Sequence, residues 1–304
     1  MRISTSWAQQ TAVNSILDQQ SKLQQTQMQL STGKKILMPS DDPAAAARSI
    51  DFNQGIKQTE QYQSNIRSAR QRLDLESGVL QNATDILQRI KELGVQGLNA
   101  TNSQSDRVII ATEMESLNEN LVSLANTRNA NGEYLFSGFK STTQAFSKNT
   151  VTGGYIYAGD SSQRTLQIGE NRQIADGDPG INIFGTPTNS LPAAGFNVNI
   201  FEAIDRFAAD MKSNTPNSAS LSDISSALDK MLTAEASVGA RLNVLDNQEG
   251  FNADFVLNTK TVLSATEDLD YAEAISKFNQ QTVSLQAAQQ AFTQVKKLSL
   301  FNYL

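Results

Sequence analysis

The side chains that could do chemistry in this chain are carboxylates, because its 304 residues include neither histidine nor cysteine. The lack of imidazole and thiolate groups excludes Ser-His and Cys-His nucleophile pairs and nearly every type of zinc site. Two clusters of acids then need an explanation, Asp41-Asp42 and Asp176-Gly177-Asp178. Acid–base or metal chemistry requires a further group opposite such a pair, and neither cluster has a third ligand at a suitable spacing nearby.

Helix capping and turn formation explain both clusters better than catalysis. Gly33 is placed to end one helix, and Asp41 or Asp42 is placed to cap the next. Pro43 then takes the first helical position, where its missing N–H costs nothing. The alternative is a carboxylate enzyme such as a glycosidase, in which two acids must face each other across a sugar. Because the acids lie mainly on helix faces and at caps, we predict no enzymatic activity, no cofactor and no metal site.

Composition points to a helical protein with no affinity for nucleic acid. Hydrophobic residues make up 39% of the chain and aromatic residues only 7%, so the apolar side chains are mostly those that form helix seams. A net charge of −6 leaves no basic field to neutralise phosphates. The sequence has no run of about 18 apolar residues and no apolar core of a cleaved signal peptide near its start. We therefore expect neither membrane insertion nor a cleaved leader.

Apolar residues recur at spacings of three and four near both ends of the chain, which predicts two helices. Both seams are diluted by glutamine, for example at Gln20 and Gln27 in the first. Such helices bury too little apolar surface to be stable alone, so we predict that they pair with each other or with neighbouring subunits. The predicted interface residues, all on these two seams, are Val13, Ile16, Leu23, Leu30, Tyr271, Ile275, Phe278, Leu285, Phe292 and Val295.

The interior of the chain predicts a helical bundle. Seams over residues 66–90 and 110–124 predict two long helices that pack antiparallel, and Glu76 is the one interruption of the first. Helical spacing returns at residues 200–207 and again from about 220 to the end of the chain. We expect a break near Glu267-Asp268, where the acids would open the final helix at its positive dipole end.

Between about residues 131 and 195 the helical spacing gives way to strands and turns. Short strands are predicted at residues 155–157, 163–168 and 173–174, and glycines such as Gly132 and Gly138 mark turns. This segment therefore predicts a β-rich insert, which we expect to be dispensable: removing residues 145–190 should spare assembly.

These observations predict a mainly α fold, in which both chain ends form a long antiparallel helical bundle or coiled coil and a small β-rich insert domain lies in the middle of the sequence. Three parts are expected. Residues 1–45 with 265–304 form terminal arms, disordered in the monomer and folding on assembly. Residues 46–140 with 196–264 form a helical bundle, and residues 141–195 form an exposed insert.

Three segments resemble those shared by flagellins and hook-associated proteins. They are Leu30-Ser31-Thr32-Gly33-Lys34, Pro39-Ser40-Asp41-Asp42-Pro43-Ala44-Ala45 and Glu267-Asp268-Leu269-Asp270-Tyr271-Ala272-Glu273-Ala274. Within that family, residues 134–140 and 298–304 resemble the member at the junction of hook and filament more than flagellin. The resemblance covers about residues 1–140 and 200–304.

The resemblance implies a structural subunit of the extracellular bacterial flagellum. Its expected partners are further copies in a ring, the first hook-associated protein, flagellin and a cytoplasmic export chaperone on the C-terminal helix. Export would use the flagellar type III apparatus. Two alternatives stay open: a flagellin filament subunit, or a type III secreted translocator or adhesin that binds through residues 141–195.

Overall fold

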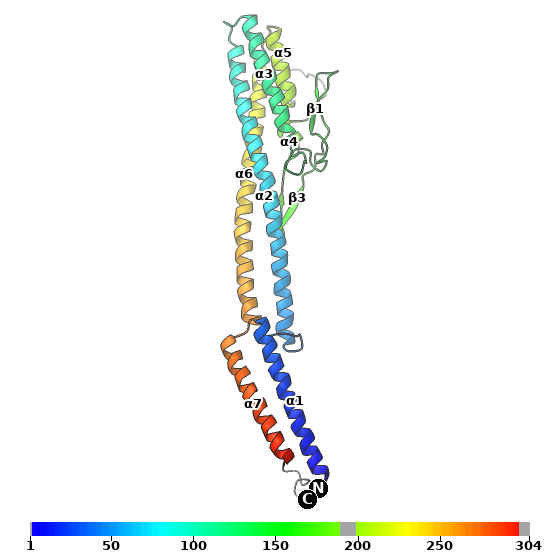
Figure 1. The fold of residues 1–304 in the computed structure, drawn as a ribbon. Helices are drawn as coiled ribbons and strands as arrows, with labels where there is room; N and C mark the ends of the chain where they lie inside the picture. The colour runs from blue at the N-terminus through cyan, green and yellow to red at the C-terminus, as the bar shows by residue number, and fades with distance from the viewer. Residues whose placement is uncertain (1, 189–198, 298–304) are drawn as a thin grey trace. The chain divides into compact units, whose positions relative to one another are not determined.

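The computed structural model describes residues 2–188 and 199–297, and it confirms a mainly α fold with short antiparallel strands in the middle (Figure 1). The helices are α1 (Arg2–Thr32), α2 (Pro43–Gly97), α3 (Gln104–Ala125), α4 (Gly180–Phe184), α5 (Ile200–Lys212), α6 (Ser218–Glu267) and α7 (Tyr271–Lys297). The strands are β1 (Phe146–Lys148), β2 (Tyr155–Tyr157), β3 (Thr165–Gly169) and β4 (Arg172–Ala175). The chain divides into two compact units. Unit 1 comprises residues 1–58 and 254–304, and unit 2 comprises residues 59–253.

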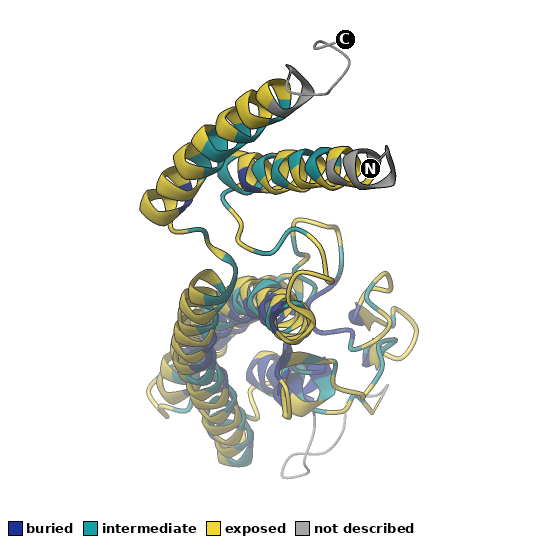
Figure 2. Ribbon diagram, turned by 90° about the horizontal axis from the view of Figure 1, so that it is seen from below, coloured by how far each residue is buried: buried dark blue, intermediate teal, exposed yellow. Residues whose placement is uncertain are grey.

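In unit 1 the two chain-terminal helices pack against each other, as the diluted seams predict (Figure 1). The contact is only partly closed to solvent: Gln281 of α7 is half-buried in it, whereas Gln20 and Gln27 of the predicted α1 seam are exposed. Among the described side chains, Thr26 is the one buried residue of α1 and Ala274 is the one buried residue of α7. Exposed and intermediate residues accordingly dominate both helices in Figure 2.

In unit 2 the cores of α2 and α6 follow a strict heptad spacing. Every seventh residue of α6 from Ile224 through Met231 and Val238 to Leu245 is fully buried. The two helices run antiparallel: residues early in α2 contact residues late in α6, and residues late in α2 contact residues early in α6. Gln63 Nε2 donates to the Glu249 carbonyl at 2.8 Å. At the other end, Gly94 packs against Leu221. A seam of this kind buries one apolar stripe per helix and explains the length of both.

Helix α3 returns along α2 and packs on α5, which completes the helical core. Arg89 on α2 pairs with Glu113 on α3 at 2.8 Å, and Arg107 Nε donates to the Gly97 carbonyl at 3.1 Å. These contacts confirm the antiparallel arrangement expected for the two seams. Close packing is possible because α2 carries Gly94 and Gly97 where α5 approaches.

The central segment forms two separate antiparallel pairs, β1 with β2 and β3 with β4. Phe146 is opposite Tyr157 in the first pair, and Thr165 is opposite Ala175 in the second. Strands β2, β3 and β4 match the predicted strands, whereas the sequence pattern missed β1 and α4. Strand β1 has the same length as β2 but carries a single apolar residue, Phe146, and α4 with five residues is too short to show a period.

The β-rich segment contributes to the core of unit 2. Phe146, Tyr155 and Phe184 belong to the same buried cluster as the side chains of α3 and α5. The Phe146 and Phe201 rings meet with centroids 5.1 Å apart. The predicted turn glycines adopt left-handed conformations, with φ of +79° at Gly132 and +61° at Gly138. Among the described helices, none is both long and apolar enough to cross a membrane.

Candidate functional site

The segments that carry the family resemblance meet in unit 1. The loop after α1 runs beside the short link between α6 and α7, and Lys34 and Asp268 form an antiparallel bridge. Lys35 N donates to the Glu267 carbonyl at 2.7 Å, and Leu269 N donates to the Gly33 carbonyl at 3.0 Å. We call this meeting point, residues 33–42 with 264–273, the joint. Two motifs far apart in the sequence therefore build one structure.

Gly33 ends α1 at the joint. Its N–H donates to the Gln29 carbonyl at 2.8 Å, and its φ is +70°, a conformation that side chains other than glycine rarely adopt. A Cβ at this position would also lie 2.8 Å from the hydroxyl oxygen of Tyr271. Glycine is thus required both by the backbone turn and by the approach of α7.

The two aspartates of the loop have different tasks, which the sequence left open. Asp42 caps α2, because its Oδ1 accepts the Ala45 N–H at 2.9 Å, and Pro43 is the first helical residue. Asp41 Oδ2 instead accepts the N–H groups of Leu37 and Met38, both at 3.0 Å, and so closes the loop.

The break between α6 and α7 lies where the sequence predicts it, but the capping residue is different. We expected Glu267 and Asp268 to open the last helix; instead Glu267 ends α6 and Asp270 caps α7. Asp270 Oδ1 accepts the N–H groups of Ala272 at 2.9 Å and Glu273 at 3.2 Å. The signal for this cap is present in the sequence, since an aspartate followed three residues later by glutamate resembles a capping box.

An ion pair ties the two segments together. Lys34 Nζ lies 2.9 Å from Glu267 Oε2, and this hydrogen bond is the main reason that the pKa of Glu267 lies below its usual range. The Glu267 side chain is 13% exposed, so the pair is partly shielded from water. The interaction fixes the start of the loop to the end of α6.

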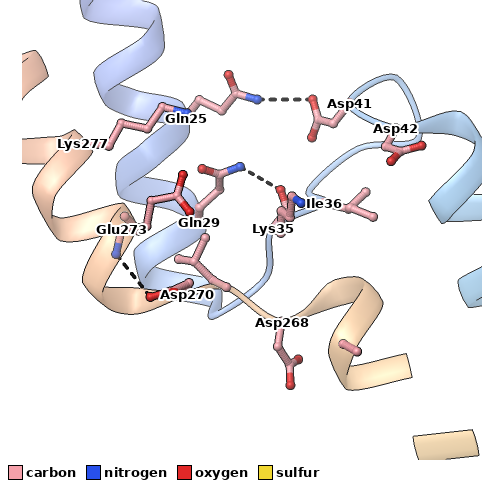
Figure 3. A pocket seen from close by; sticks show the side chains of 13 residues that line it. Gln25, Gln29, Lys35, Ile36, Asp41, Asp42, Asp268, Asp270, Glu273 and Lys277 are labelled. Atoms are coloured by element: carbon pink, nitrogen blue, oxygen red, sulfur yellow. Dashed lines mark hydrogen bonds between the residues drawn. The ribbon is translucent and has the colours of Figure 1, made fainter. Parts of the chain in front are cut away.

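Glutamines of α1 position the loop, a role that sequence reasoning missed. Gln29 Nε2 donates to the Lys35 carbonyl at 2.7 Å, and Gln25 Nε2 donates to Asp41 Oδ1 at 3.3 Å (Figure 3). They border a polar hollow of about 480 Å³ in the joint. Its charged lining residues are Lys35, Asp41, Asp42, Asp268, Asp270, Glu273 and Lys277. Several of these acids accept backbone N–H groups, so the arrangement fixes the chain, and no cluster of three metal-ligating side chains occurs among the described residues.

The predicted interface residues fall into three groups. One group is half-buried in the two paired helices, and it comprises Val13, Ile16, Leu23, Leu30, Phe278, Leu285 and Phe292. Tyr271 and Ile275 are instead 52% and 50% exposed. The side chain of Val295 lies outside the described part of the chain. The seam pattern did not single out Trp7, Leu17, Met28 and Val283, which are exposed apolar residues on α1 and α7.

The motifs that meet at the joint are those that resemble segments of flagellins and hook-associated proteins. In agreement, the sequence model of the bacterial flagellin N-terminal helical region matches residues 3–141. Flagellar hook-associated protein 3 of Escherichia coli K12 is 32% identical over 317 residues, covering 99% of both chains. The protein of the same name from Salmonella typhimurium LT2 matches with the same identity and coverage.

The structural comparison agrees with the sequence comparison. The crystal structure of the flagellar junction protein from Legionella pneumophila superposes with a TM-score of 0.60 at 25% identity, covering 74% of this chain and all of that one. The chain belongs to the family of flagellar hook-associated protein 3, the component of the bacterial flagellum at the hook–filament junction. This confirms the junction prediction over the flagellin alternative.

Proposed function

We propose that the chain is a non-enzymatic axial subunit that joins the first hook-associated protein to flagellin, and that α1 and α7 are its assembly surface. The observation that carries this proposal is the chemistry of these two helices. Their outer faces combine exposed apolar residues with amides and have long stretches without charge. Such faces suit burial against neighbouring subunits, including further copies in a ring.

The lack of charge extends over most of both helices. Residues 7–17, 23–33 and 278–294 contain no acid and no base. A helix that faces water ordinarily carries acids and bases, which keep proteins soluble. Exposed apolar residues are spread along these segments, among them Trp7 at 71% and Val283 at 65% exposure. Faces of this kind are favourable only where another surface covers them.

The partly open contact between α1 and α7 supports the same proposal. Most described side chains of the seam are half-buried, and Tyr271 and Ile275 are exposed, whereas those of the α6 seam in unit 2 are fully buried. Two helices that close their shared face so incompletely gain little stability from pairing alone. We therefore infer that the arms are poorly ordered in the free subunit and that contacts with neighbours complete their burial.

The apolar seam residues of α7 are also suited to recognition by a chaperone before export. Phe278, Leu285 and Phe292 recur at helical spacing, and a helix of this type binds in an apolar groove of a partner. We infer that a cytoplasmic chaperone covers this face and that the flagellar type III apparatus then exports the chain. Covering the face would also prevent assembly inside the cell.

The test is the double variant Leu285→Asp with Phe292→Asp. Two carboxylates in a seam without bases have no counter-charge, so we expect normal folding of unit 2 and loss of junction assembly. Folding is measured by circular dichroism and cooperative unfolding, and assembly by swimming and filament attachment in a strain lacking the native gene. The matched control is Val151→Asp with Asn182→Asp, which adds the same charge at exposed positions of unit 2. Full motility of the Leu285/Phe292 variant would refute the proposal.

A further inference from the structure

A carboxyl group is buried within the apolar seam of α2. Glu76 lies one turn from Leu73 and Leu80 and has no exposed surface. Its Oε1 accepts the N–H of Asp178 at 3.2 Å, from the loop that follows β4. Its Oε2 is buried and has no hydrogen-bond partner. Burial of an ionised carboxylate with so few partners is costly, so this group requires an explanation.

The nearby arginines are engaged with other groups. Arg72, one turn earlier on α2, donates to the Leu135 carbonyl at 3.0 Å and pairs with Glu133 at 3.4 Å. Arg241 on α6 pairs with Asp178. Among the described residues, none forms an ion pair with Glu76.

Further charges surround the loop without reaching Glu76. Arg164, which precedes β3, donates through its Nε to Asp176 Oδ2 at 2.8 Å. Gln163 Nε2 donates to Asp178 Oδ1 at 2.6 Å. The backbone lies directly on the buried groups, since a Cβ at Gly177 would come within 3.1 Å of Arg72 Nε and 3.7 Å of Glu76 Oε2. The loop of residues 176–180 therefore covers the Glu76 carboxyl group.

The protonation state of Glu76 follows from this environment. Burial, followed by the negative charge of Asp178, raises the pKa of Glu76 to about 8. At neutral pH the neutral acid is therefore the favoured form. If the loop lifts, water reaches the carboxyl group and its pKa returns toward the ordinary value of 4.5.

We propose that Glu76 and residues 176–180 form a proton-controlled latch, in which the loop closes on the neutral acid and opens when the acid loses its proton to solvent. The closed loop fixes the β3–β4 hairpin to α2 and α6. With the loop open, the hairpin stays attached to unit 2 through its apolar contacts and through hydrogen bonds outside the latch, such as those from Asn65 Nδ2 to the Gln167 carbonyl at 2.7 Å and from Asn252 Nδ2 to the Ile168 carbonyl at 3.1 Å. The latch is a device of unit 2 and is independent of the assembly surface on α1 and α7.

The sign of the pH dependence follows from linkage. The closed state binds the proton more tightly than the open state, so closure is most favourable in acid. Between about pH 5 and pH 8 the opening constant should increase tenfold per pH unit, because opening releases one proton. Above about pH 8 both states are ionised, and the opening constant should become constant.

The experiment is amide hydrogen exchange of the full chain from pH 5 to pH 9, read by mass spectrometry and corrected for the intrinsic pH dependence of exchange. We expect protection of residues 176–184 to fall tenfold per pH unit and to level off near pH 8. Peptides from residues 110–121 of α3 serve as the internal reference and should change little. In Glu76→Gln, which keeps an acceptor oxygen but cannot ionise, loop protection should be independent of pH. An equal fall in this variant, or no fall in the native chain, would overturn the proposal.

A second variant covers the case in which Glu76→Gln does not fold. Asp178→Asn removes the like charge beside Glu76 and releases Arg241 from its partner. Both changes favour the ionised form of Glu76. The amide protection of residues 176–184 should therefore level off at a lower pH, and the total loss of protection should be smaller. A levelling-off point that stays near pH 8 would contradict the latch.

Discussion

Several acids of this protein act through the backbone. Asp42 and Asp270 cap helices, and Asp41 closes a loop, so each accepts N–H groups that a helix end or turn would otherwise leave unpaired. Capping by the Asp41-Asp42 pair was predictable, because the spacing to Gly33 and Pro43 suits no other role. Which of the two caps α2 was not, because both acids precede the helix and only the path of the loop distinguishes them.

Two glycines of α2 make a matched test of packing at the scale of the residue. A Cβ at Gly94 would lie 2.6 Å from Phe207 Cε1, whereas a Cβ at Gly78 would meet no atom within 4 Å. Alanine is favoured over glycine in a helix by about 1 kcal/mol. We therefore expect Gly78→Ala to raise the free energy of unfolding by up to about 1 kcal/mol. Gly94→Ala should lower it by about 1–3 kcal/mol, because the Phe207 ring must move.

Chemical denaturation of the two glycine variants measures this difference. The same substitution in the same helix is compared twice, so helix propensity cancels and only the contacts with Phe207 on α5 and Leu221 on α6 differ. Equal effects of both substitutions would show that α5 can withdraw from Gly94 at little cost.

At the scale of the element, periodic seams were predictable and short or polar contacts were not. The α6 seam is fully buried every seventh residue, and helical spacing from about residue 220 predicted the helix but not which of its residues form the seam. The sequence pattern placed Gln29 on the flank of the α1 seam and gave it no role, yet Gln29 positions the loop through the Lys35 carbonyl. A long side chain that hydrogen-bonds a distant backbone atom leaves no period in the sequence. Glu76 was likewise visible only as an interruption until the loop above it was known.

Because of the Lys34–Glu267 ion pair, the stability of the contact between the loop and the α6–α7 link should depend on pH. The pKa of Glu267 is lowered mainly by the Lys34 hydrogen bond, so the stabilisation is present above its ordinary value of 4.5 and is lost as pH falls through the lowered pKa. Lys34→Gln should reduce the protection of amides 33–37 at pH 7 by an amount equivalent to about 0.2–1 kcal/mol, because Lys34 is half-exposed.

Hydrogen exchange of the full chain at pH 7 and pH 3 tests this dependence. The difference between Lys34→Gln and the native chain should shrink at pH 3, because protonation of Glu267 removes its charge attraction to Lys34. Lys35→Gln is the control, because it removes a neighbouring positive charge but keeps the backbone hydrogen bond to Glu267. A difference that persists unchanged at pH 3 would mean that Lys34 acts by packing and not by charge.

At the scale of the whole molecule, burial differs between the two units. Unit 2 has a continuous apolar core with fully buried side chains on α2, α3, α5 and α6. Helices α1 and α7 of unit 1 present mostly half-buried seams and outer faces with long uncharged stretches, which fits an element that completes its core on assembly. The sequence predicted this contrast through its glutamine content. It did not show that the β-rich segment shares the core of unit 2, since contacts between distant segments leave no local pattern.

This shared core changes the expectation for the central segment. Sequence reasoning expected removal of residues 145–190 to be tolerated. The structure leads us to expect the opposite, because the deletion removes Phe146, Tyr155 and Phe184 from the core and leaves Phe201 without its aromatic neighbours. Loss of even one such ring costs about 3–5 kcal/mol, comparable with the stability of a whole domain. Circular dichroism and thermal unfolding should therefore show that unit 2 no longer unfolds cooperatively.

A shorter deletion in the same segment distinguishes the loss of core side chains from the shortening of the segment. The β1–β2 turn begins at Asn149 and ends at Gly154, and the Asn149 N–H donates to the Gly154 carbonyl at 2.8 Å. Removing residues 150–153 joins these two residues into an Asn-Gly turn between Lys148 and Tyr155, which are already paired. Asn-Gly is a preferred sequence for a two-residue hairpin, so this variant should retain the native thermal midpoint within a few degrees. If the short deletion unfolded unit 2 and the long one did not, the aromatic core would not be what stabilises the segment.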